Sequence, residues 1–130
     1  MTVPASRGLW TPRWSPDGEH LLALTPNPNA YESTALWLFS FHTQKWKKLI
    51  DYVIDEPAWS HDGKDIYFNR MTATKAKVFR IGVHHPKLEE LVDSTNFSHG
   101  VTWFGLAPDD SPLLQHNTRD YRIYALDVVW

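Results

Sequence analysis

The fold is decided by one short stretch near the start of the chain, Pro12-Arg13-Trp14-Ser15-Pro16-Asp17-Gly18. The pattern returns at residues 57–63 as Pro-Ala-Trp-Ser-His-Asp-Gly, and a weaker copy spans residues 101–110. Trp14 and Trp59 are 45 residues apart, and Trp59 and Trp103 are 44 apart. A period of about 40–45 residues is typical of the four-stranded blade of a β-propeller.

The last four residues of the stretch predict a tight turn. Ser15 stands first, Pro16 second and Gly18 fourth, which are the preferred places of these residue types in a type I turn. In the second copy His61 replaces the proline, and in the third Asp110 replaces the glycine. The third copy also has three more residues between its tryptophan and its turn, so we expect a bulge or a longer loop there.

Strands are expected in the same order after each turn. Apolar runs predict strands at residues 21–25, 66–70 and 113–117. The next strand of each repeat alternates large apolar side chains with others, which is the period of a strand. Those side chains are Trp37, Phe39 and Phe41, then Phe79, Ile81 and Val83, then Tyr124, Leu126 and Val128. Fourth strands are expected at residues 46–50 and 88–92, and the third repeat stops one strand short.

The sequence thus predicts an all-β chain with one domain over residues 1–130. It would be a β-propeller fragment with complete blades at about 12–51 and 57–93 and a three-stranded blade at about 101–130. We expect Trp14, Trp59 and Trp103 to be buried at the inner strands. Between neighbouring sheets we expect the side chains of Trp37, Phe39, Phe79, Ile81, Tyr124 and Leu126. Thr2 and Val3 precede Trp14 by the distances that separate Leu91-Val92 from Trp103, which suggests a remnant of a preceding fourth strand.

Bulk composition excludes several classes of protein. Hydrophobic residues make up 42% of the 130 residues, which favours a globular chain over a disordered one. The net charge of −2 gives no basic excess for nucleic acid, so no nucleic-acid partner is expected. Cysteine is absent, which excludes disulfides and thiolate metal sites. No apolar run is long enough to span a membrane and no signal peptide is visible, so a cytoplasmic location is the expectation for the chain as it stands.

The Trp-Ser-Pro-Asp-Gly turn and the 45-residue period resemble the WD-like repeats of TolB-type β-propellers. The resemblance covers residues 12–128, and the last part of the chain is similar to the final propeller repeat of large bacterial multidomain proteins. It implies a six-bladed ring used for protein–protein contacts, and it implies no activity. Because one fold hosts many functions, any activity has to be argued from the side chains themselves.

The candidate ligand residues recur with the repeat. The seven histidines are His20, His42, His61, His84, His85, His99 and His116. His42 and His84 hold equivalent positions and could bind a metal or respond to pH, but we interpret them as polar turn residues. Asp17, Asp62 and Asp109 could form an acidic ring, but we expect each to cap its own turn.

No catalytic constellation emerges from the remaining residues. Ser15, Ser60 and Ser98 lie in no nucleophile elbow, and the chain has no glycine-rich phosphate loop. Lys45, Lys47 and Lys48 surround Trp46 and are interpreted as charges that keep an outer strand edge soluble. We therefore predict no catalytic, cofactor-binding or metal-binding residues, and no cofactor.

The function expected from the sequence is a non-catalytic propeller module for protein–protein interaction or scaffolding. Three blades cannot close a ring, so we expect self-association, most simply a homodimer that forms six blades. Residues around Met1 to Ala5 could supply the missing strand of the partner's third blade. The alternatives are an accessory or catalytic propeller of a hydrolase or lyase, and a glycan-binding propeller.

Overall fold

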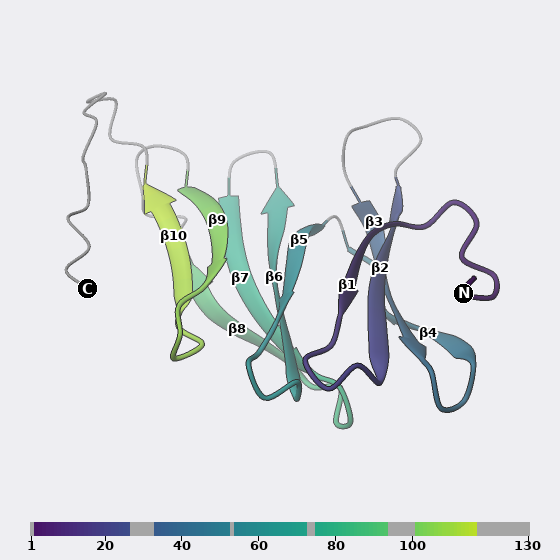
Figure 1. The fold of residues 1–130 in the computed structure, drawn as a ribbon. Helices are drawn as coiled ribbons and strands as arrows, with labels where there is room; N and C mark the ends of the chain where they lie inside the picture. Colours follow the sequence, from purple (N-terminus) through teal and green to yellow (C-terminus); the bar gives the residue numbers. More distant parts are fainter. Residues whose placement is uncertain (1, 27–32, 53, 73–74, 94–100, 117–130) are drawn as a thin grey trace, which may run out of the picture.

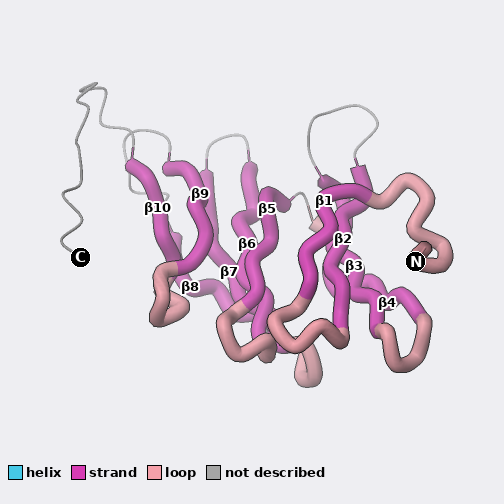
Figure 2. The backbone as a smooth tube through the Cα atoms, in the orientation of Figure 1, coloured by secondary structure: helices cyan, strands magenta, loops and turns pink. Residues whose placement is uncertain are grey.

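The structure is a computed structural model that describes residues 2–26, 33–52, 54–72, 75–93 and 101–116. The described part contains ten strands and no helix (Figures 1 and 2), and hence no helix that could cross a membrane. Blade 1 consists of β1 (Trp10–Trp14), β2 (His20–Pro26), β3 (Ser33–Ser40) and β4 (Lys45–Ile50). Blade 2 consists of β5 (Ile54–Trp59), β6 (Asp65–Thr72), β7 (Lys75–Gly82) and β8 (Leu88–Asp93). The third blade begins with β9 (Val101–Leu106) and β10 (Pro112–His116).

Each blade is an antiparallel meander in which consecutive strands are hydrogen-bonded neighbours. A single residue pair, Ser33 of β3 with Ile54 of β5, links the strands of blades 1 and 2. The three blades stand side by side in Figure 1, in the order in which they occur in the sequence. The all-β propeller fragment that the repeat predicted is therefore the observed architecture.

The main core lies between blades 1 and 2. Blade 1 contributes one face of its β2 and β3 strands, and blade 2 contributes the facing side of β6 and β7. The side chains that meet are Leu22, Leu24, Leu36 and Leu38 from blade 1, and Ile66, Phe68, Phe79 and Ile81 from blade 2. The rings of Phe68 and Phe79 stack with their centroids 5.8 Å apart. Phe79 and Ile81 thus pack between sheets as the alternation predicted.

A smaller core joins blade 2 to the third blade. Tyr67 and Val78 are buried on the other face of blade 2, and they pack against Leu106 and Leu114 of the third blade. Alternation along β6 places Tyr67 and Phe68 on opposite faces, so one strand serves two interfaces. Each blade therefore has one face toward the preceding blade and one toward the following blade.

The third blade departs from the predicted register. The Ala107 amide donates to the Ser111 carbonyl, four residues on, whereas the Ser15 and Ser60 amides donate to carbonyls five residues on. This turn is thus one residue shorter than the others, and β10 begins at Pro112 instead of residue 113. A register shift lies between Leu113 and Leu114, where a bulge was expected, but the first strand pairs of blades 1 and 2 have one as well, so the extra residues are not its cause.

A leucine stands at the tryptophan position of the third blade. Leu106 pairs with Pro112 in the way that Trp14 pairs with Leu21 and Trp59 with Ile66. The equivalent of Trp14 and Trp59 is therefore Leu106, and the alignment of Trp103 with them was wrong. The alignment followed residue type, although the spacing from the turn points to the leucine. Leu106 directly precedes Ala107 as Trp14 precedes Ser15, whereas Trp103 precedes Ala107 by four residues.

Several predicted positions lie outside the described residues. These are the third strand of the last repeat, including Tyr124, Leu126 and Val128, together with Ser98, His99 and the side chains of Trp103 and His116.

Candidate functional site

The three turns that carry the repeat motif lie along one edge of the molecule, the lower edge in Figure 1. In each turn an aspartate accepts hydrogen bonds from its own turn. Asp17 accepts from the Ser15 hydroxyl and the Glu19 amide, and Asp62 accepts from the Ser60 hydroxyl and the Lys64 amide. Asp109 accepts from both the hydroxyl and the amide of Ser111. The prediction that these aspartates cap their turns is confirmed.

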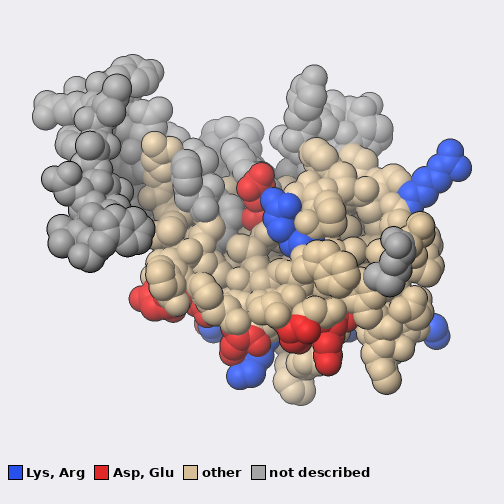
Figure 3. Space-filling model, viewed as in Figure 1, with Lys and Arg blue, Asp and Glu red and all other residues tan. Residues whose placement is uncertain are grey.

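Turn capping sets the charge state of these carboxylates. The Lys64 amide and then the Ser60 hydroxyl stabilise the ionised form of Asp62 and lower its pKa to about 2. The Ser15 hydroxyl and the Glu19 amide lower the pKa of Asp17, and Ser111 lowers that of Asp109. The turn edge therefore stays acidic at neutral pH, and acidic side chains gather along it in Figure 3.

The serines of the first two turns are structural. Ser15 and Ser60 are buried, and each hydroxyl donates to the turn aspartate while accepting from a backbone amide, that of His20 or Asp65. A hydroxyl held in this way is not presented to a substrate. The interpretation that neither serine is a nucleophile stays a prediction.

Adjacent turns contact one another at the same two positions. A Cβ added to Gly63 would lie 3.5 Å from Cδ of Pro16, so the second residue of turn one faces the fourth residue of turn two. Turns two and three make the same contact with other side chains. The second residue of turn two, His61, has its Nδ1 2.6 Å from Oδ1 of Asp110, the fourth residue of turn three.

Histidines meet across the first blade interface, but not the pair that the sequence singled out. His42 and His84 are both exposed. The ring of His84 lies beside His20 of blade 1, with centroids 6.3 Å apart, and His20 also lies 6.5 Å from the ring of Trp59. This grouping escaped the sequence analysis because His20 and His84 come from different positions of the repeat.

One cluster near His20 could offer ligand atoms to a cation. Ligand atoms of Asp17, Glu19 and His20 lie within 4.8 Å of one another. Asp17 already serves its turn, and the cluster is largely exposed. In blade 2 the positions of Asp17 and Glu19 hold Asp62 and Lys64, whose side chains form an ion pair of 3.1 Å. The arrangement therefore does not repeat from blade to blade.

A polar pocket of about 420 Å³ lies at the same rim, next to His84 and His85. Three of its charged side chains, Lys64, Arg80 and Glu89, form ion pairs. The Arg80 guanidinium lies 2.6 Å from the Glu89 carboxylate, which lowers the pKa of Glu89, and Lys64 pairs with Asp62. Asp65 and Lys87 line the pocket as well.

The lysine cluster around Trp46 lies on β4, the outer strand of blade 1. Lys45 and Lys47 are exposed on β4, while the Lys48 ammonium pairs with Asp51 at 3.0 Å and lies 5.8 Å from the Trp37 ring centroid. Charged side chains on an outer strand discourage further strand pairing.

The face of blade 1 that points away from blade 2 is the most distinctive surface, and we call it the open face. On it lie Leu21, Ala23, Trp37 and Phe39, on the opposite side of the sheet from the leucines of the main core. Phe39 contacts the rings of Phe41 and Trp46. Trp37 and Phe39 hence face outward from blade 1, and among the described residues no second sheet packs against them as the sequence predicted.

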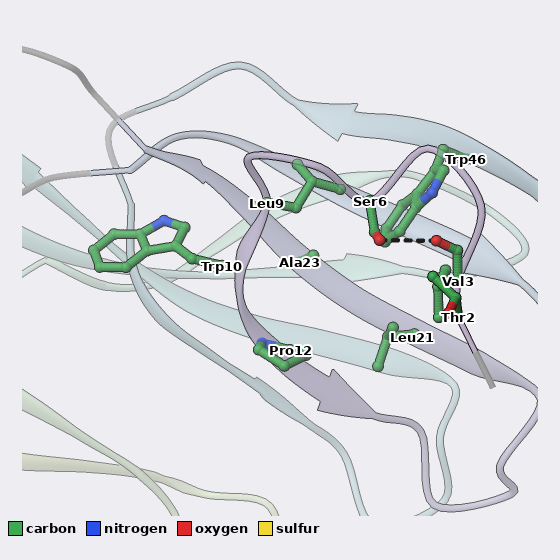
Figure 4. A pocket seen from close by; sticks show the side chains of 9 residues that line it. All are labelled: Thr2, Val3, Ser6, Leu9, Trp10, Pro12, Leu21, Ala23 and Trp46. Atoms are coloured by element: carbon green, nitrogen blue, oxygen red, sulfur yellow. Dashed lines mark hydrogen bonds between the residues drawn. The ribbon is translucent and has the colours of Figure 1, made fainter.

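The N-terminal segment, residues 2–9, lies over part of the open face. The Trp46 indole nitrogen donates to the Pro4 carbonyl at 2.7 Å, and the Ser6 hydroxyl donates to the Val3 carbonyl at 2.8 Å. A pocket of about 330 Å³ remains between segment and sheet (Figure 4), lined among others by Leu9, Trp10, Leu21 and Ala23. Thr2 and Val3 form no strand, so the predicted remnant of a preceding fourth strand is not found.

The part of the open face around Trp14, on the first strand β1, is exposed. Trp14 is 55% exposed and stacks on Phe41, with centroids 4.6 Å apart and planes 2° apart. Its equivalent in blade 2, Trp59, is partly buried against blade 1 and its indole nitrogen donates to the Arg13 carbonyl at 3.1 Å. The prediction that Trp14 is buried was therefore wrong, because the preceding blade that would cover it is not supplied by the described residues.

The face of the third blade that points away from blade 2 also exposes an apolar side chain. Leu113 is 46% exposed, whereas its equivalents Leu22 and Tyr67 are 0% and 5% exposed because each packs against a following blade. Both ends of the row of blades thus present apolar side chains at positions that are buried or partly buried wherever two described blades meet.

No model of a known protein family matches this chain, and no curated protein matches its sequence. Solved structures do match. The β-propeller domain of the Trilobed protease from Pyrococcus furiosus, described as having an open velcro topology, superposes with a TM-score of 0.60 and 18% identity. That match covers 75% of this chain and 31% of the other.

Two further structures show the same likeness. TolB from Acinetobacter baumannii matches with a TM-score of 0.56 and 16% identity, over 82% of this chain and 28% of the other. The Pyrococcus horikoshii acylaminoacyl peptidase matches with a TM-score of 0.59 and 18% identity, over 94% of this chain and 20% of the other. The chain thus spans less than a third of the length of each of these proteins. The fold is that of a TolB-like β-propeller fragment.

Proposed function

We propose that this chain is a non-catalytic β-propeller module that closes its ring by self-association and serves in protein–protein contacts. The observation that supports the proposal is the pair of unfilled blade positions at the two ends, Trp14 on blade 1 and Leu113 on the third blade. Apolar side chains at such positions favour association, because packing removes their surface from water. Two copies of three blades give six, which is within the usual range of propellers.

The contact that closes such a ring is head-to-tail. The open face of blade 1 and the outward face of the third blade are different surfaces, so each copy would use one of each, and a two-fold axis makes the two contacts equivalent. In the ring, the N-terminal segment would leave its own sheet. Thr2 and Val3 stand 45 residues before Lys47 and Lys48 of β4, which is the place of an outer strand in the preceding blade.

Light scattering of the purified chain at several concentrations tests the proposal. We expect a species of about twice the chain mass of 15.1 kDa, whose population falls on dilution. A well-folded chain that remains monomeric at every concentration contradicts self-association. Peptidase, esterase and lyase substrates should give no turnover above the buffer rate.

A second candidate is an accessory propeller of a peptidase. It is favoured by the names of the structural neighbours, since two of the proteins above are named as a protease and a peptidase. An accessory propeller would bind a separate catalytic domain in preference to a second copy. A monomeric chain that forms a 1:1 complex with a hydrolase encoded beside it would support this candidate over the first.

A further inference from the structure

We infer that the ring is closed by a second copy of this chain through a specific set of contacts, in which Trp14 and Gly18 of one copy meet Gly105 and Pro108 of the other. The inference rests on the proposed self-association and adds the residues that make the contact. The contacts seen between adjacent blades of one chain are applied to the junction between the third blade of one copy and blade 1 of the other.

The first contact is a hydrogen bond from an indole. Between blades 1 and 2, the Trp59 indole nitrogen donates to the carbonyl of Arg13, the residue before Trp14. The strand pairing makes Gly105 the equivalent of Arg13, because Gly105 pairs with Leu113 as Arg13 pairs with Leu22. A third blade placed before blade 1 would therefore offer its Gly105 carbonyl to the Trp14 indole. In the described part of the chain, Trp14 makes its ring contact with Phe41 and no hydrogen bond from its indole.

The second contact is between turns. The second residue of each turn faces the fourth residue of the next, as Pro16 faces Gly63 and His61 faces Asp110. Continuing the series, Pro108 of the third turn would face Gly18 of the first turn of the next copy. A Cβ added to Gly18 has no described atom within 4 Å, whereas one added to Gly63 meets Pro16. The space before Gly18 is thus open to a second copy.

The residue types at the two ends are complementary, which argues for a second copy over an unrelated partner. Proline faces glycine at the first junction, and histidine faces aspartate at the second. The free ends carry Pro108 and Gly18, so a junction between two copies repeats the proline–glycine pair seen between blades 1 and 2. The apolar side chains also match, since Leu113 would enter the open face as Leu22 enters the main core.

The test is the association of purified variants, measured by sedimentation equilibrium. Trp14→Ala and Leu113→Asp should each weaken the dimer on the order of 100-fold, since each removes a central apolar contact. The control Leu88→Asp changes an exposed leucine on the outer strand β8 and should leave the dimer unchanged. Mixing Trp14→Ala with Leu113→Asp should restore a 1:1 dimer, because one junction of a head-to-tail pair then carries both native residues.

A second pair of variants tests the turn contact by rescue. Gly18→Asp should fold normally, because Asp110 already occupies the equivalent position with a φ of 62°. It should weaken the dimer by placing a carboxylate against Pro108. Adding Pro108→His should restore association, because the new pair repeats the contact of His61 with Asp110.

The outcomes separate this inference from the proposed function. A wild-type chain that is monomeric throughout overturns both. A wild-type dimer whose dissociation is unaffected by Trp14→Ala and Gly18→Asp overturns the inference while leaving self-association in place. A mixture of Trp14→Ala and Leu113→Asp that stays monomeric, beside a dimeric wild type, overturns the head-to-tail arrangement.

Discussion

His61 and Asp110 join the turn of blade 2 to the turn of the third blade. Nδ1 of His61 lies 2.6 Å from Oδ1 of Asp110, and the same oxygen accepts from the His61 amide at 3.0 Å. The third blade otherwise rests on the small core around Tyr67 and Val78. This contact therefore fixes the third blade at the turn edge, where Pro16 and Gly63 perform the same task for blades 1 and 2.

Asp110→Ala should loosen the third blade without unfolding blades 1 and 2. The loss should be small, about 1 kcal/mol or less, because the pair is partly exposed. Hydrogen exchange followed by mass spectrometry should show faster exchange in β9 and β10 and unchanged rates in β2 and β3. Equal acceleration in all blades would contradict the local role of the contact.

Phe79→Ala should destabilise the chain strongly. Phe79 is buried between blades 1 and 2 and stacks on Phe68, so truncation leaves a cavity and should cost on the order of 2–5 kcal/mol. The urea midpoint of unfolding measures this loss. Leu88→Ala, at an exposed position on β8, is the control and should leave the midpoint nearly unchanged. A midpoint of Phe79→Ala equal to that of the wild type would rule out the assigned register.

Asp62→Ala should reduce stability at pH 5 and do so less and less as the pH falls. The pKa of Asp62 is lowered to about 2 in the folded chain, against an ordinary value of 3.8. A lowered folded pKa gives stability that is present above pH 4 and is lost as the pH falls through 2. Urea midpoints of both proteins between pH 5 and pH 2 should therefore converge, and a constant gap over that range would contradict turn capping by the ionised form.

Trp46→Phe should release the N-terminal segment. The substitution keeps an aromatic ring beside Phe39 but removes the hydrogen bond to the Pro4 carbonyl. Amides of residues 2–9 should exchange faster, while β2 and β3 keep their protection. Trp37→Phe is the matched control, because its indole donates to Thr25 and not to the segment. Identical exchange in both variants would mean that Trp46 does not hold the segment.

His42→Ala and His84→Ala should each leave the fold and any metal content unchanged, because both side chains are exposed at the rim of their blades. Urea unfolding and elemental analysis of the purified proteins check this. A metal ion present in the wild type and absent from either variant would show that the histidines bind it, and the turn interpretation would then fail.

The sequence by itself determined the repeat, the turns and the blade cores. These depend on local rules: Pro16 and Gly18 favour the turn, Asp17 caps it through bonds that span two residues, and alternation along β3 and β7 assigns each apolar side chain to a face. Such features are encoded within a few neighbouring residues, so reading along the chain is sufficient to find them.

Only the tertiary structure decided which residues of different blades meet. Leu106 takes the place expected for Trp103, as the strand pairing shows, because Leu106 pairs with Pro112 in the way that Trp14 pairs with Leu21. His20 meets His84, and the N-terminal segment lies on Trp46, through packing between distant parts of the chain. Burial of Trp14 depends on a neighbouring blade. Its exposure therefore follows from what stands beside blade 1, which no property of the tryptophan or its flanking residues specifies.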